Sequence, residues 1–154
     1  MLIFLDIDGV MVPAKNWQRP ELLSDGFPTF SSKAVNTLKK IINKDTTVIL
    51  TTSHKSKYNV NEWVAIFSRR GLRFKKLDKL IDNLDNLNRK DEILRWFASN
   101  KLPNDFLIID DDSSLNDLPV NIKKNLILTR PLIGLSESDI EDNQFLINHN
   151  LIKA

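Results

Sequence analysis

Residues 1–11 read MLIFLDIDGVM, and this stretch decides the fold. Leu2–Leu5 is apolar without polar alternation, which is typical of a strand buried on both faces of a parallel sheet. Asp6 and Asp8 follow directly, with Ile7 between them. In an extended segment residues two apart point to the same side, so both carboxylates face one way while Ile7 turns back to the core. A buried strand that ends in charge has reached either the surface or a site.

Further apolar runs alternate with helical patterns along the chain. Besides the first run, strands are predicted at Val48–Leu50, Phe106–Ile109 and Leu126–Leu128, with a weaker fifth within Leu72–Leu77. Helices are predicted from a Ser32 cap to about Asn43, over Asn61–Arg70, from an Asn88 cap, and from a capping motif at 136–139 to Asn148. Such alternation implies right-handed crossovers. We therefore expect an α/β fold, a Rossmann-like three-layer αβα sandwich around a mostly parallel five-stranded sheet.

Length and composition indicate one ordinary domain, residues 1–154. The chain is 42% hydrophobic and 27% charged, which is typical of a globular protein. Its net charge of +2 gives no global field for nucleic acid, and we expect the basic stretch at 69–79 to be a solvated helix end and loop. The absence of cysteine excludes disulfides, thiolate nucleophiles and Cys-based zinc sites, and two histidines disfavour a His-rich metal site. Catalysis must rest on carboxylates, hydroxyls and lysine.

The apolar start does not have the pattern of a targeting segment. Asp6 and Asp8 interrupt it too soon for a signal peptide or a membrane span. We therefore expect a cytoplasmic protein without a membrane partner.

Residues 10–30 form the one irregular region, with three prolines and a glycine. The region is too short for an extra domain, and we interpret it as a flap over a site. Trp17 within it is expected to pack on the domain, with stacking on a ring of the substrate as the alternative. Trp63 and Trp96 lie in predicted helices and are expected in the core.

Polar residues follow the predicted strands where each strand ends. Asp6 and Asp8 follow the first strand, Thr51–His54 follows the second, and Asp110–Asp112 follows the strand at 106–109. Arg89-Lys90 begins the helix before that last strand. Strand ends and helix starts share one edge of a parallel sheet, where ligands bind. We therefore expect these groups to converge.

This set of residues suits phosphoryl transfer. Carboxylates from two strands raise one another's pKa values, and a divalent cation removes that penalty; oxygen ligands without His or Cys indicate Mg²⁺. An aspartate can attack phosphorus and carry the phosphoryl group as an acyl phosphate, while a hydroxyl and a lysine hold the equatorial oxygens. Asp8 can protonate the leaving oxygen and later activate water. Gly9 lets the chain turn close to the phosphate.

The motifs resemble those of the haloacid dehalogenase (HAD) superfamily of phosphatases. Asp6-Ile7-Asp8-Gly9, Thr52, Lys90 and Ile109-Asp110-Asp111 resemble the four motifs of that superfamily, in its order and on its strands and helices. The resemblance spans essentially the whole chain. Segments 89–93, 108–112 and 128–136 are similar to the small HAD domains associated with RNA-repair proteins.

The resemblance implies roles for these residues. Asp6 would be the nucleophile and Asp8 the acid/base. Mg²⁺ would bind Asp6, the backbone carbonyl of Asp8, and Asp110 or Asp111. The expected substrate-binding residues are Gly9, Thr52, Ser53 and Lys90.

Some assignments stay open at the level of sequence. Thr51 competes with Thr52 as the phosphate ligand, and Arg89 competes with Lys90. Three consecutive aspartates at 110–112 leave the metal ligand undecided, and the role of His54 is open.

The expected function is a Mg²⁺-dependent phosphatase with an aspartyl-phosphate intermediate on Asp6. A response-regulator receiver domain accepts a phosphoryl group at an aspartate on a later strand, with its Thr and Lys further downstream. It is disfavoured because here Asp6-Ile7-Asp8-Gly9 comes first, and the Thr and Lys precede the second acidic cluster. A non-catalytic interaction module is disfavoured because both Asp6 and Asp8 are retained. We expect no large cap domain, and an open site suits a phosphate on a large molecule, such as a nucleic-acid end or a phosphoprotein. Alternatively, oligomerisation would close the site over a small molecule or nucleotide.

Overall fold

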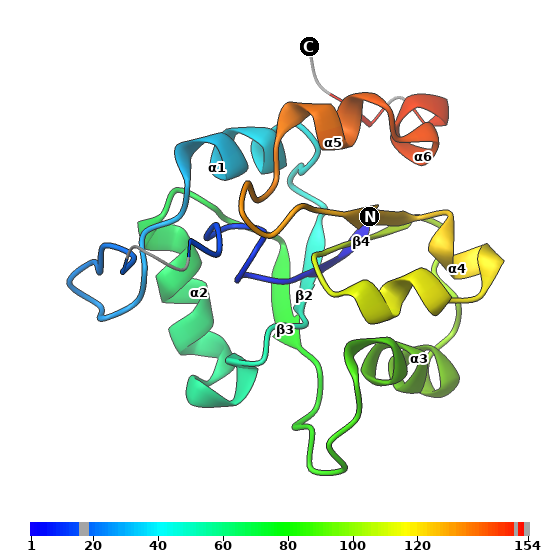
Figure 1. The fold of residues 1–154 in the computed structure, drawn as a ribbon, viewed down its shortest axis with the longest axis horizontal. Helices are drawn as coiled ribbons and strands as arrows, with labels where there is room; N and C mark the ends of the chain where they lie inside the picture. Colours follow the sequence, from blue (N-terminus) through cyan, green and yellow to red (C-terminus); the bar gives the residue numbers. More distant parts are fainter. Residues whose placement is uncertain (16–18, 150, 153–154) are drawn as a thin grey trace.

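Strand β1 (Leu2–Leu5) lies at the centre of a five-stranded, all-parallel sheet (Figure 1). The computed structural model describes residues 1–15, 19–149 and 151–152. The strand order is β3-β2-β1-β4-β5. The other strands are β2 (Thr47–Leu50), β3 (Lys76–Lys79), β4 (Phe106–Asp110) and β5 (Leu126–Leu128). The predicted α/β class and parallel sheet are confirmed, and none of the described segments forms a separate cap over the strand ends.

Helices cover both faces of the sheet (Figure 1). They are α1 (Ser32–Lys39), α2 (Val60–Arg69), α3 (Arg89–Ser99), α4 (Val120–Lys123), α5 (Glu137–Glu141) and α6 (Gln144–Asn148), with 3₁₀ turns η1 (Lys55–Lys57) and η2 (Ser113–Asp117). Helices α1, α2, α5 and α6 pack on one face, and α3, η2 and α4 on the other. The sandwich therefore has three layers. Among the described residues, no helix combines the length and the apolar character that a membrane crossing requires.

The alternation of side chains along β1 builds the two halves of the core. Ile3 and Leu5 join the cluster under α1 and α2, and Phe4 joins the cluster under α3. Phe4 meets Trp96 edge to face, with ring centroids 4.9 Å apart. Trp63 is fully buried, as expected, whereas Trp96 is only partly buried against the core. Each fully buried large side chain contributes about 1.5–3 kcal/mol, so β1 is anchored from both sides.

Strand β3, which was predicted within Leu72–Leu77, lies later in the chain than predicted. It runs over Lys76–Lys79, and only Leu77 within it is fully buried. Phe74, which made the predicted window apolar, packs on Phe67 of α2 before the strand begins. β3 is an edge strand, and lysines at such an edge block pairing with other chains. The sequence of β3 is therefore mostly polar, and for this reason the strand was predicted too early in the chain.

Helix boundaries differ from the predictions where side chains cap the backbone. α1 is capped by Ser31 and ends at Lys39, four residues before Asn43. The predicted last helix is two helices, because the Asn143 side chain accepts the Leu146 N–H and starts a new one. The predicted caps at Asn88 and Ser136 are confirmed.

The segment predicted as a flap is tied to α2 by Arg70. Within the described residues of 10–30, isolated bridges pair Asp8 with Val12 and Leu22 with Pro28. Arg70 is nearly buried and contacts this segment, so the basic stretch at 69–79 is not wholly solvated as predicted. Trp17 lies outside the described residues.

Candidate active site

Three carboxylates meet at the carboxyl ends of β1 and β4. Asp6 follows β1, Asp110 ends β4, and Asp111 comes next. One oxygen atom of each lies within 4.8 Å of the others. β1 and β4 are neighbours at the point where the strand order reverses, which is where ligands bind in open parallel sheets. The predicted convergence is therefore present in the structure.

Asp110 is fully buried and its carboxylate is fully engaged. One oxygen accepts the N–H groups of Asp111 and Asp112, at 2.8 and 3.1 Å. The other accepts the Thr51 hydroxyl at 3.0 Å and Nη1 of Arg89 at 2.5 Å. A carboxylate offers about four lone-pair sites, and all four are used here. A cation at Asp110 would have to displace one of these partners.

Asp111 is half-buried and lies against Gly9. Gly9 has a φ of +79°, and a Cβ atom added to it would overlap the carboxylate of Asp111. The Gly9 carbonyl is fixed by the Thr129 hydroxyl, which donates to it at 2.7 Å. Gly9 thus lets the turn after β1 bring Asp6 and Asp111 together.

Asp112 has a capping role. Its side chain accepts the N–H of Ser114 at 2.9 Å at the start of η2. The cluster of close carboxylate oxygens therefore contains Asp110 and Asp111 but not Asp112.

Arg89 extends the site into the interior. Its Nη1 lies 2.5 Å from Asp110 Oδ2 and 3.5 Å from Asp6 Oδ2, and its Nε lies 3.8 Å from Glu92 Oε1. Glu92 pairs in turn with Lys55 at 2.7 Å, and both of these side chains are about 95% buried. Among the described residues, Nε of Arg89 has no hydrogen-bond acceptor.

Lys90, the predicted phosphate ligand, is half-buried at the start of α3. Its backbone N–H donates to the Ser114 hydroxyl at 3.1 Å. Within the described parts of the chain, its side chain forms no ion pair. Arg89 is the cation that contacts the carboxylates, while the Lys90 ammonium is uncommitted.

Burial and mutual repulsion control the charge of the cluster. Burial, reinforced by the carboxylate of Asp110, raises the pKa of Asp6 to about 9, and Arg89 compensates only in part. Burial likewise raises the pKa of Asp111. Burial by itself lowers the pKa of Arg89, but Asp110 and Asp6 outweigh it, so that pKa is raised and the guanidinium keeps its charge. Full ionisation would give the cluster more negative charge than its own cations neutralise, and the raised pKa values of Asp6 and Asp111 reflect that cost.

The donor set fits a hard divalent cation. The candidate ligand atoms of the cluster are all carboxylate oxygens, which hard divalent cations prefer. Four carboxyl groups (Asp6, Asp110, Asp111 and Glu92) stand against two cations (Arg89 and Lys55), so two negative charges would be left over with all four ionised. A divalent ion supplies that charge and would return Asp6 to its carboxylate form.

The two threonines after β2 differ in their remaining hydrogen-bond capacity, although both are fully buried. Thr51 donates its hydroxyl to Asp110. Thr52 accepts the His54 N–H at 3.2 Å, and its own hydroxyl hydrogen has no acceptor among the described residues. Thr52 therefore retains a donor for a phosphate oxygen. Ser53 is exposed beside it.

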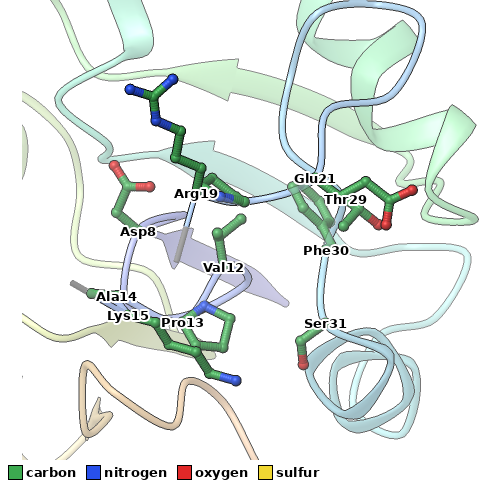
Figure 2. A pocket seen from close by; sticks show the side chains of 11 residues that line it. Asp8, Val12, Pro13, Ala14, Lys15, Arg19, Glu21, Thr29, Phe30 and Ser31 are labelled. Carbon is green, nitrogen blue, oxygen red and sulfur yellow. The ribbon is translucent and has the colours of Figure 1, made fainter. Parts of the chain in front are cut away.

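Asp8 lies outside the carboxylate cluster and faces a pocket. Its side chain is 55% exposed, and Oδ2 lies 2.7 Å from Nε2 of His54. The pocket has a volume of about 700 Å³ and reaches from Asp8 to the flap segment. Figure 2 shows Asp8 at one side and Phe30 and Ser31 at the other, with Val12 between them. Ile7 is fully buried, as predicted for the residue between the two carboxylates.

The buried network behind the carboxylates was not predicted from the sequence. Glu92 and Lys55 were not recognised as part of the site, and Arg89 was only an alternative to Lys90. The i,i+3 spacing of Arg89 and Glu92 on α3 was the available signal for that pair. No local signal marks Lys55, because its partner lies on another element.

Comparison with known proteins gives one match. The sequence model of a family described as the HAD domain in Swiss Army Knife RNA repair proteins matches residues 2–140. None of the curated proteins and none of the solved structures compared matches the chain. The match runs from the start of β1 into α5, and so covers every residue of the site described above.

Proposed function

The chain belongs to the family of HAD domains in Swiss Army Knife RNA repair proteins, and from that premise we propose that it is a phosphomonoester hydrolase acting through Asp6. The family supports a HAD-type, phosphatase-like function. The observation that carries the proposal is the convergence of Asp6, Asp110 and Asp111 with Arg89 at the strand ends. A site built only for stability would gain little from three carboxylates that repel one another.

In this proposal an oxygen of Asp6 attacks phosphorus. The new P–O bond forms as the bond to the leaving oxygen breaks, and Asp8 gives its proton to that oxygen, so the leaving group departs as an alcohol. Asp8 then takes a proton from water as the water attacks the aspartyl phosphate. Inorganic phosphate is released and the Asp6 carboxylate is restored.

Charge on the equatorial phosphoryl oxygens is neutralised by groups around Asp6. Among the described residues, the hydroxyl hydrogen of Thr52 has no acceptor and the ammonium of Lys90 has no partner. Arg89 holds Asp110 and faces Asp6, so it orients the nucleophile. Ser53, next to Thr52 in the chain, and Gly9, next to Asp8, complete the proposed substrate contacts.

Mg²⁺ is the proposed cofactor, and when bound it would polarise the phosphoryl group and neutralise the excess charge. Asp6, Asp111 and the backbone carbonyl of Asp8 would hold it. Asp110 would stabilise the ion by its charge, or would exchange one of its four partners for it.

We further propose that the substrate phosphate sits on a large molecule, such as a nucleic-acid end. The pocket beside Asp8 opens onto the flap segment, and none of the described segments forms a cap over it. The description of the matching family, which refers to RNA repair, supports the same class. Phosphorylated oligonucleotides with a phosphate at the 3′ or 5′ end are therefore the first natural-type substrates to test.

The test is hydrolysis of an aryl phosphate by the purified protein with and without Mg²⁺. Wild-type protein should turn over with Mg²⁺ and not after chelation, and Asp6→Asn should be at least about 10³-fold slower. Unchanged turnover in Asp6→Asn would exclude Asp6 as the nucleophile. A lack of activity on every ester, oligonucleotide ends included, would instead favour a non-catalytic interaction module.

A further inference from the structure

His54 is the one histidine that approaches the catalytic carboxylates. Its Nε2 lies 2.7 Å from Oδ2 of Asp8, which is within hydrogen-bond distance. Among the described residues, no other side chain or backbone group bonds the Asp8 carboxylate. Asp8 is 55% exposed, and an exposed aspartate with no partner would sample several rotamers. The contact with His54 is therefore what selects one orientation.

His54 is itself held firmly enough to do this. Its backbone N–H donates to the Thr52 hydroxyl, and its ring meets the Phe27 ring edge to face at 6.4 Å. The next residue, Lys55, is buried. Its carbonyl accepts hydrogen bonds from Nε1 of Trp63 at 3.1 Å and from Nζ of Lys79 at 2.9 Å. The main chain beneath the imidazole is thus fixed to α2 and β3.

We propose that His54 is a positioning residue that holds the Asp8 carboxyl group where it exchanges a proton with the leaving oxygen. The inference rests on the phosphatase function proposed above. In the first step Asp8 gives its proton to the ester oxygen while that oxygen's bond to phosphorus breaks and Asp6 bonds to phosphorus. A misdirected Asp8 leaves the attack intact but delivers the proton poorly. His54 therefore matters most when the leaving group needs that proton.

Two substrates separate this role from a structural one. The leaving group of 4-nitrophenyl phosphate departs as a stable anion, whereas glycerol 2-phosphate releases an alkoxide unless its oxygen is protonated. His54→Ala should lower kcat/KM, which reports the steps up to formation of the aspartyl phosphate, by about 10- to 100-fold on glycerol 2-phosphate, a part of the general-acid contribution. On 4-nitrophenyl phosphate the loss in kcat/KM should stay below about threefold. His54→Gln keeps a side-chain N–H donor and should recover most of the lost activity.

Matched controls make the result specific. His149→Ala removes the chain's other histidine, which lies at the end of α6 and bonds Phe145, and should leave both rates unchanged. Thermal unfolding of each variant checks that it is folded. Equal losses on both substrates, or no loss on either, would overturn the positioning role while leaving the phosphatase intact. A wild-type protein inactive on both esters would overturn the phosphatase function, and the inference with it.

Discussion

Two buried arginines in this chain are used in opposite ways. Arg70, after α2, has an acceptor for each of its five N–H groups. Two go to the carboxylate of Asp25 and three to the carbonyls of Ile66, Phe27 and Pro28. The guanidinium also lies about 5 Å from the rings of Phe27 and Phe30. It joins the flap segment to the domain.

Arg89 has fewer satisfied hydrogen bonds than Arg70, and it lies among more carboxylates. Its Nε has no acceptor among the described residues, and Asp6 and Asp110 compete for Nη1. A group selected for stability has its hydrogen bonds satisfied, whereas a group at a reactive centre keeps unused capacity beside charges that repel one another. The contrast indicates that the strand-end site, unlike the flap anchor, is arranged for a ligand.

The same substitution at both arginines should separate the two roles most sharply. Arg70→Met removes five hydrogen bonds, two to Asp25 and three to backbone carbonyls, and should cost about 3 kcal/mol of unfolding free energy, with turnover reduced less than tenfold. Arg89→Met should lower turnover about 100-fold, with a smaller stability loss when Mg²⁺ is present. Chemical denaturation and steady-state kinetics measure both quantities. The comparison fails if Arg89→Met proves the more destabilising variant and retains full turnover.

Two glycines with the same backbone conformation extend the comparison. Gly9 and Gly26 both have φ of +79°, but a Cβ atom at Gly26 meets nothing within 4 Å, whereas at Gly9 it overlaps Asp111. Both alanine variants should lose about 1–2 kcal/mol through backbone strain. Only Gly9→Ala should also reduce the rise in Tm that Mg²⁺ produces, because it displaces a carboxylate of the cluster. Equal Mg²⁺ effects in the two variants would mean that Asp111 does not hold the ion.

The smallest expected effect is the pH dependence of the stability that the Arg70–Asp25 pair gives to the flap segment. The hydrogen bonds from Arg70 lower the pKa of Asp25 from 3.8 to about 2. A lowered folded-state pKa gives stability that is present above about pH 4 and lost as the pH falls towards 2. Because Asp25 is partly exposed, solvent screening reduces this contribution to stability to about 1 kcal/mol. The stability difference between wild type and Asp25→Asn should shrink by that amount between pH 4.5 and 2.5, and a constant difference would contradict it.

The central strands and the carboxylates at their ends could be predicted from the sequence because both signals are local. An uninterrupted apolar run such as Leu2–Leu5 identifies a buried strand, and Asp6 and Asp110 follow such runs directly. The edge strand Lys76–Lys79 was misplaced because three of its four residues are polar and leave a weak apolar pattern.

The unpredicted contacts of the site join residues far apart in sequence. The pairing of His54 with Asp8 and of Lys55 with Glu92 depends on how β2, β1 and α3 are packed together. The choice between Arg89 and Lys90 depends on the rotation of α3 about its axis. A side chain one residue earlier or later on a helix points in a different direction, and sequence spacing alone does not fix that direction.

The most direct test of the central claim is acid quenching of the protein during turnover with Mg²⁺, followed by peptide mass spectrometry. We predict one added phosphoryl group on the N-terminal peptide at Asp6, and none in Asp6→Asn. Turnover of the wild type with no such adduct at Asp6, or with an adduct on another residue, would contradict the account.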